Sequence, residues 1–439
     1  QTFKLVIVST KIIDQVLIVS EIIRHALYFF IVFFIYYLIY LRIQMKVFFL
    51  LYLTVSTLSF TKGGSFSNDS MGVEDHIILI ADMQLQIDIN QAMNDMYNFK
   101  FEEAEKQYRW LKQKYGWHPL PYFLKGLSEW WKLMPNIDNR KHDEEFLAYM
   151  DTVISISNRL YEIPRHEVEA SFFLAAAYGF IGRLHSSEER KNWRKSAVAG
   201  KNALKYMQKS EGMHDLSPEL LFGDALYNYF SVWVPQNYPL LKPIIAFFPK
   251  GDKELGIKQL KEVSYNAFYT RTEAMVFLMR ILGAYEGQSK EALRLSKYLH
   301  ETYPDNPYFH RYYARLLYSS GNFKGAKPVA EEILQKIDNE LPGYEGTSGR
   351  YAAFFLGQIY DNRNSHEEAM ANYKKAIEYS EAIGATDTGY YHYSLLSLGK
   401  IYAQLGDKDK AKKYFKAVKS SAKRSSKVHK SARTQLKRL

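Results

Sequence analysis

Residues 356–376 read LGQIYDNRNSHEEAMANYKKA, and residues 398–418 read LGKIYAQLGDKDKAKKYFKAV. In each stretch an alanine, Ala369 or Ala411, follows a tyrosine by nine residues, with turn-forming residues between them. Ala326 follows an earlier leucine at the same distance. Two antiparallel helices approach closely only where small residues meet, and large residues three or four positions away fill the space beside that contact. These stretches therefore predict stacked helical hairpins.

The same pattern continues toward the N-terminus. The alanines are 34 residues apart from Ala292 to Ala326, and the next two intervals are 43 and 42 residues. Pro304 follows Ala292 by twelve residues. Ala104 and Tyr108 mark a further repeat near the start of the helical region. The predicted repeat signature comprises Ala104, Tyr108, Ala292, Pro304, Ala326, Leu356, Gly357, Tyr360, Ala369, Tyr373, Ala376, Leu398, Gly399, Tyr402, Ala411 and Phe415.

Between residues 119 and 270 the repeat signature fades, but helical periodicity persists. Phe146, Met150 and Val153, for example, follow the three-and-four spacing of an amphipathic helix. No run in this region alternates as a strand paired in a hairpin would. We therefore predict an all-α fold over residues 75–422, an α-solenoid of roughly seven or eight helix pairs. Degenerate repeats are expected over 75–232 and regular repeats over 253–422.

The helical pattern is interrupted over residues 233–252, a mostly apolar segment that contains four prolines. Proline lacks an N–H donor and its ring clashes inside a helix, so this segment is not an ordinary turn between helices. An apolar loop has to be packed or bound. We favour a buried brace that fills one end of the superhelix, because apolar loops are usually satisfied internally. The alternative is a wedge that faces a membrane or a partner.

The repeat residues resemble those of the tetratricopeptide repeat family. This resemblance implies antiparallel helix pairs wound into a right-handed superhelix, and a role in binding. The run over residues 123–136 is similar to that of uncharacterised repeat proteins common in the Bacteroidetes. A helix end, then the apolar Pro-rich stretch, and then Gly251, Asp252, Gly256, Ile257 and Leu260 together resemble the central segment of the tetratricopeptide repeat protein 39 family, which implies an adaptor role.

Two apolar segments precede the repeats. The first methionine is Met45, and residues 45–59 have one positive charge, an apolar run and then small residues, as a secretory signal peptide does. We expect residues 45–67 to be a signal peptide and leader, and the mature protein to be periplasmic or associated with the outer membrane. Residues 1–44 are expected to precede the true start. Alternatively, the apolar residues 26–41 anchor the chain in a membrane.

Positive charge is concentrated at the C-terminal end. Residues 408–439 contain thirteen Lys and Arg and one acidic residue, a charge of +12 that leaves −1 for the rest of the chain. We expect the last repeat helix to end near Ser420 and the basic tail, residues 423–439, to fray. The tail either caps the solenoid with polar surface or binds anionic lipid headgroups. A nucleic-acid partner is not expected, because no recognition fold accompanies the tail.

The sequence gives no reason to expect catalysis, a cofactor or a metal. It contains no cysteine, and its twelve histidines show no metal-binding spacing. Phosphate-loop and nucleophile-elbow motifs are absent. In repeats of this kind, residues of the first helices face the concave side and hold peptides or helices. The candidate partner groove comprises Tyr312, Arg315, Tyr351, Phe354, Tyr391 and His392.

The repeats, the signal-like segment and the missing catalytic motifs together predict a non-enzymatic, exported scaffold that binds a protein or peptide partner in the cell envelope. The alternative is a membrane-peripheral adaptor that binds anionic lipid through the Pro-rich insertion and the basic tail. A third possibility, an activity hidden in residues 119–270, would need a polar pocket that sequence cannot display.

Overall fold

The computed structural model describes residues 77–187, 189–210, 212–237, 239, 242 and 249–439. The expected upstream segment 1–44 and the expected signal peptide and leader 45–67 lie outside these residues, as does most of the Pro-rich insertion.

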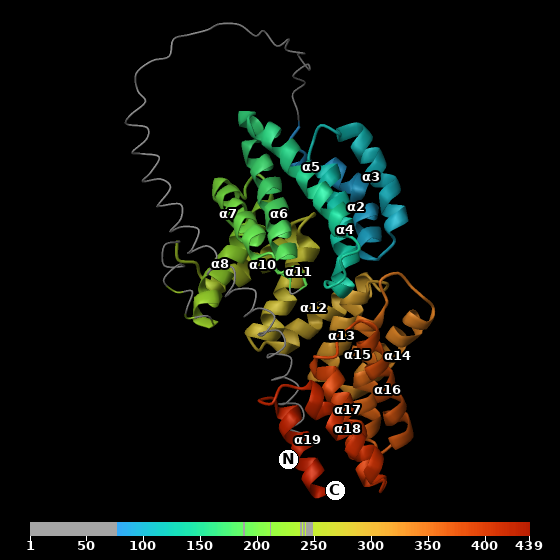
Figure 1. Cartoon of the computed structure of the whole chain (residues 1–439). Coiled ribbons are helices and arrows are strands. Elements are labelled where there is room, and N and C mark those ends of the chain that lie inside the picture. Colours follow the sequence, from blue (N-terminus) through green and yellow to red (C-terminus); the bar gives the residue numbers. More distant parts are fainter. Residues whose placement is uncertain (1–76, 188, 211, 238, 240–241, 243–248) are drawn as a thin grey trace, which may run out of the picture.

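The described part of the chain is helical and contains no strand (Figure 1). Its α-helices are α2 (Met83–Tyr97), α3 (Phe101–Tyr115), α4 (Leu120–Leu133), α5 (Asp143–Tyr161), α6 (Glu167–His185), α7 (Trp193–Lys209), α8 (Leu221–Asn237), α10 (Lys253–Asn266), α11 (Arg271–Arg280), α12 (Ser289–Thr302), α13 (Pro307–Ser319), α14 (Phe323–Asp338), α15 (Gly346–Asp361), α16 (His366–Ala382), α17 (Gly389–Gln404), α18 (Lys408–Ser421) and α19 (Lys427–Arg438). They form eight antiparallel pairs, from α2/α3 to α17/α18, followed by α19. The predicted all-α solenoid is confirmed.

The turn between the two helices of a repeat contains a residue in the left-handed conformation. Five residues before the signature alanines of α12, α14 and α18 stand Gly287, Gly321 and Gly406, all with positive φ. Asn364 occupies the same position before α16, with φ 58°. Glycine and asparagine adopt this left-handed conformation most readily, so the chain can reverse tightly between the two helices. All the signature alanines are buried; of the whole signature, only Pro304, Tyr360 and Tyr402 are exposed or partly exposed.

Two signature glycines allow the helices of a pair to touch. A Cβ added to Gly399 would lie 2.5 Å from Cε1 of Phe415, and one added to Gly357 would lie 2.7 Å from Cδ1 of Tyr373. Both rings are fully buried, so they have no room to move aside. The glycine and the aromatic residue of the sequence signature are therefore explained by a close contact between the first and the second helix of a repeat.

Replacing Gly399 with Ala should lower the free energy of unfolding by about 1–3 kcal/mol, the usual cost of overpacking a core. Gly179 in α6 is the matched control, because an added Cβ there would meet nothing within 4 Å. Gly179→Ala should leave stability unchanged or raise it by about 0.5–1 kcal/mol through the better helix propensity of alanine. Urea unfolding of both variants checks this. Equal effects in the two would show that the contact at Phe415 is unimportant.

The superhelix closes on itself in its N-terminal half. Tyr97 of α2 lies 5.3 Å from Trp131 of α4 and 5.4 Å from Tyr303 after α12, measured between ring centroids. The Asn306 side chain donates a hydrogen bond of 2.7 Å to the Tyr97 carbonyl, across 209 positions of sequence. Arg311 of α13 likewise donates to the Pro135 carbonyl at 2.9 Å. Helices α2 to α13 thus form a closed ring with one hydrophobic core, which extends from Leu79 to Phe309.

From α13, the last helix of the ring, a C-terminal stack continues through α18, in orange and red in Figure 1. The basic tail forms α19, so the expectation that it frays was wrong. Val428, His429 and Ala432 of α19 are buried, and α19 packs against α17 and α18. Three residues on one face are enough to hold this short helix, although its other positions are mostly charged or polar.

The expected start of the insertion at residue 233 was also wrong, because α8 continues to Asn237 with Pro235 inside its last turn. A proline so close to the end of a helix disturbs only the final turn. The described end of the insertion lies along α8. The Tyr227 hydroxyl donates to the Pro249 carbonyl at 2.8 Å, and Asp252 caps α10 by accepting the N–H of Glu254 and Leu255.

Candidate functional site

The six residues of the predicted groove do not form one surface. Phe354 is buried and packs 5.0 Å from Tyr390, and His392 is also buried. Their side chains are therefore not offered to a partner. Tyr391 is partly exposed, but its hydroxyl donates to Glu381 of α16, away from the row described next. Phe354 and His392 were assigned to the groove wrongly, because the sequence of a helix with many apolar residues does not show which of its faces is exposed to solvent.

The other three groove residues lie in a row along the first helices of the C-terminal stack. Tyr312 of α13 is partly exposed, and the guanidinium of Arg315 lies 5.4 Å from the centre of its ring. Arg311 reaches Tyr351 of α15 at 5.6 Å, and Tyr351 lies 4.4 Å from Tyr390 of α17. Rings and guanidinium groups of this kind are typical of protein interfaces. We call Tyr312, Arg315 and Tyr351 the aromatic row.

A second candidate lies inside the closed ring and was not foreseen. An apolar pocket of about 440 Å³ is lined by α4, α6, α7, α8 and α11. The pocket lies at a break in the solenoid. In the other repeats, the second helix of a pair packs against the first helix of the next pair. Within the described residues, α7 makes few contacts with α8. Met207 of α7 reaches toward α8: its Cγ would lie 3.0 Å from a Cβ added to Gly223. The volume lies within the range of about 300–1,000 Å³ of small-molecule sites.

One basic and one acidic side chain line this pocket. The Arg183 guanidinium lies over the rings of Trp130 at 4.8 Å and Phe277 at 5.5 Å. Burial, reinforced by repulsion from Arg280, lowers the pKa of Arg183 to about 10, so it remains a cation at neutral pH. Burial raises the pKa of Glu273, and the attraction of Arg183 opposes that rise. Glu273 accepts a hydrogen bond from Nε1 of Trp131 at 2.9 Å.

The sequence contained one signal for this pocket. Helix α6 is apolar over most of its length, yet it carries small residues at Ala175, Ala176 and Gly179 and then a single arginine, Arg183. Residues four apart share a helix face, so Gly179 and Arg183 face the same space. Small residues beside a charged one leave room that larger side chains would fill.

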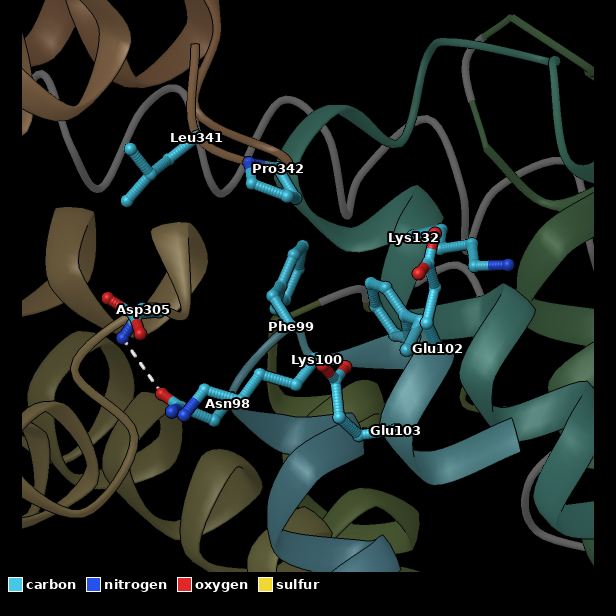
Figure 2. A pocket seen from close by; sticks show the side chains of 10 residues that line it. Asn98, Phe99, Lys100, Glu102, Glu103, Lys132, Asp305, Leu341 and Pro342 are labelled. Carbon is cyan, nitrogen blue, oxygen red and sulfur yellow. Dashed lines mark hydrogen bonds between the residues drawn. The ribbon is translucent and has the colours of Figure 1, made fainter. Parts of the chain in front are cut away.

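A third candidate is a cavity of about 500 Å³ at the seam where the ring closes (Figure 2). Its walls carry charges of both signs, with Lys100, Lys132, Glu103 and Asp305 among them. Figure 2 shows the Asp305 N–H donating to the Asn98 side chain, a bond of 2.9 Å that holds the α2–α3 turn against the loop after α12. The mixed charges favour no ligand of one sign.

Phe99 stands in the middle of this seam. It occupies the turn position that glycine or asparagine fills in later repeats, and its φ of 63° is unusual for an aromatic residue. It is buried, and a Cβ on Gly343 would lie 2.5 Å from its ring. A left-handed conformation costs such a residue roughly 1–2 kcal/mol. The packing of Phe99 across the seam therefore offsets backbone strain that a glycine would avoid.

A buried carboxylate cluster joins the first and third repeats. Glu169 of α6 accepts the Ile80 N–H at 2.7 Å, and its carboxylate oxygens lie 3.2 Å from His118 Nε2 and 3.2 Å from His166 Nδ1. Burial alone would raise the pKa of Glu169, but the contacts with the two histidines and Ile80 lower it to about 2. His118 Nδ1 accepts the Leu120 N–H at 3.1 Å, and its Nε2 faces Glu169. All three side chains are buried among the helices, which indicates a structural role.

Two groups of side chains have the donor atoms of a metal site. The possible ligand atoms of His300, His310 and Glu332 lie within 4.8 Å of one another. Lys336 Nζ lies 3.2 Å from Glu332, however, and neutralises the one anionic donor. A second group comprises Glu129, His142 and Glu145, in which Glu129 already pairs with Lys132 and His142. In both groups a carboxylate already pairs with a lysine, so neither group is proposed as a metal centre.

No described helix has the length and apolar character needed to cross a membrane. The tetratricopeptide repeat family model matches residues 351–383, which cover α15 and α16, and residues 392–424, which cover α17 and α18. The matches support a tetratricopeptide repeat protein, as predicted. Such repeats are protein–protein interaction scaffolds and generally not catalytic. A comparison with curated proteins finds no match.

Proposed function

We propose that this protein is a non-enzymatic tetratricopeptide scaffold that binds a protein or peptide partner in the bacterial cell envelope. The observation that carries the proposal is the aromatic row on α13 and α15, at the start of the stack in which the repeats match the family. The signal-like residues 45–59 support an exported location, and the likeness of residues 123–136 to Bacteroidetes proteins supports a bacterial source.

The aromatic row supplies what an interface needs. Tyr312 and Tyr351 are held by neighbouring rings and by arginines, so little side-chain entropy is lost when a partner binds. Arg315 can donate several hydrogen bonds to a carboxylate or a carbonyl of the partner. A partner segment with acidic and apolar residues fits this chemistry best.

Capture of partners from envelope extracts by the full chain tests the proposal. Tyr351→Ala and Arg315→Ala should each weaken capture of a specific partner by about tenfold or more, as expected for interface hot spots. Tyr298→Ala is the matched control, because Tyr298 is 50% exposed and lies on α12, a second helix. If all three variants capture the same proteins as the unaltered chain, the row is not the binding surface.

The alternative is a membrane-peripheral adaptor, and the C-terminal charges favour it. All thirteen Lys and Arg of residues 408–439 are exposed, so α18 and α19 present a cationic surface. Each cation close to an anionic membrane contributes about 1 kcal/mol, and salt screens this attraction. Flotation with anionic vesicles decides: binding that disappears at high salt and on replacing Lys427, Lys430 and Lys437 with Gln would favour this alternative. Absence of flotation at low salt would exclude it.

A further inference from the structure

The pocket inside the ring combines an apolar interior with one guanidinium, that of Arg183. Arg183 donates to the sulfur of Met134 at 3.9 Å, and among the described residues no carboxylate forms an ion pair with it. Arg183 is partly exposed, and Glu273, which lines the same pocket, attracts it without a direct ion pair between the two side chains. The Glu273 carboxylate accepts a hydrogen bond from Trp131 instead. The N–H groups of Arg183 can therefore donate to a carboxylate that enters the pocket.

The geometry of Arg183 suits a carboxylate. Its guanidinium carbon lies 4.8 Å from the centre of the Trp130 ring and 5.5 Å from that of Phe277, and these ring contacts use none of its N–H groups. The N–H groups that do not face the Met134 sulfur can form the parallel pair of hydrogen bonds by which arginine binds carboxylates. The remaining walls, which include Phe123, Phe180 and Leu226, offer an apolar chain a matching environment.

We propose that this pocket binds a small amphipathic acid, a molecule with one apolar chain and one terminal carboxylate, which Arg183 recognises. The ligand is expected to be a monoanion, because among the described residues that line the pocket Arg183 is the one cation, and one guanidinium pairs with one carboxylate. The site is separate from the aromatic row, so it stands or fails independently of partner binding.

Calorimetric titration of the full chain with dodecanoate, below its critical micelle concentration, tests the proposal. Dodecanol and dodecyltrimethylammonium carry the same chain with no charge or the opposite charge. Dodecanoate should bind at least about tenfold more tightly than either, since hydrogen bonds to charged groups account for a difference of that size. Equal affinity for dodecanol, or no binding of dodecanoate, would overturn the proposal.

Three variants locate the site. Arg183→Met keeps the length of the side chain without its charge and should weaken dodecanoate binding by about tenfold or more, whereas Arg183→Lys should retain part of it. Gly179→Phe should abolish binding by filling the pocket, because a Cβ there meets nothing within 4 Å. Lys201→Met, at an exposed position of α7, is the matched control and should bind normally.

Unchanged affinity in Arg183→Met or in Gly179→Phe would show that the acid binds elsewhere and would sink the proposal. If Gly179→Phe does not fold, as judged by its melting curve, Gly179→Leu serves the same purpose with a smaller side chain. A peptide that ends in apolar residues should bind more weakly than dodecanoate. Tighter binding of the peptide would assign the pocket to a protein partner instead.

Discussion

Replacing Trp131 with Ala should lower the free energy of unfolding by about 3–5 kcal/mol, the range for deleting a large buried aromatic side chain. Trp131 is fully buried and contacts Tyr97 on one side and Phe309, 5.1 Å away, on the other. It thus joins the first repeats to the sixth. Its loss would also leave Glu273 without its hydrogen-bond donor in the protein interior, a further cost.

Trp110→Ala is the matched control for this experiment. Trp110 lies on α3 with 37% of its surface exposed, so its removal should change stability by no more than about 0.5 kcal/mol. Chemical denaturation with tryptophan fluorescence and circular dichroism compares the two variants. An equally small effect of Trp131→Ala would mean that the ring gains little from closure.

The second large effect concerns Glu169. Replacement by Gln keeps the shape but removes the charge, and should destabilise the protein at neutral pH by about 3 kcal/mol, the free-energy equivalent of a pKa lowered from 4.5 to about 2. Because the folded-state pKa is the lower one, this stability is present above pH 4.5. It is lost as the pH falls from 4.5 toward 2.

Measurement of unfolding at several pH values checks this expectation. The difference between the unaltered chain and Glu169→Gln should shrink as the pH falls through the window, while Glu103→Gln, at an exposed position of α3, should show almost no difference at any pH. A pH-independent difference for Glu169 would show that the ionised carboxylate is not what stabilises the cluster.

The helix pairs could be predicted because their cause is local. Ala369 and Tyr373 lie one turn apart on α16, and Ala411 and Phe415 lie one turn apart on α18. These side chains are buried by the adjacent helix of the same helix pair. Helix α19 escaped prediction because only three of its residues are buried and most of the others are charged or polar. A short apolar face in a basic segment is too weak a pattern to distinguish from a frayed tail.

Ring closure could not be predicted, because it depends on the accumulated rotation of five helix pairs. Nothing in the sequence near Tyr97 indicates that it will meet Tyr303. The pocket follows from the same long-range geometry, since Arg183 and Glu273 come from helices about 90 residues apart in sequence. For the groove the error was local. Phe354 lies on a first helix as expected, but on the face of that helix that neighbouring helices cover.

The seam at Asn306 and Tyr97 also has a consequence for the order of folding. In an open array each repeat needs only the one before it, so structure can spread along the chain as it leaves the ribosome. Here the Tyr97 carbonyl must wait for a partner 209 positions later. Contacts at such separations slow folding because a long loop has to close before any stabilisation is gained. The N-terminal repeats therefore keep one edge uncovered while 209 further residues of the 439 are synthesised, and during that interval the nascent ring is exposed to chaperones and to aggregation.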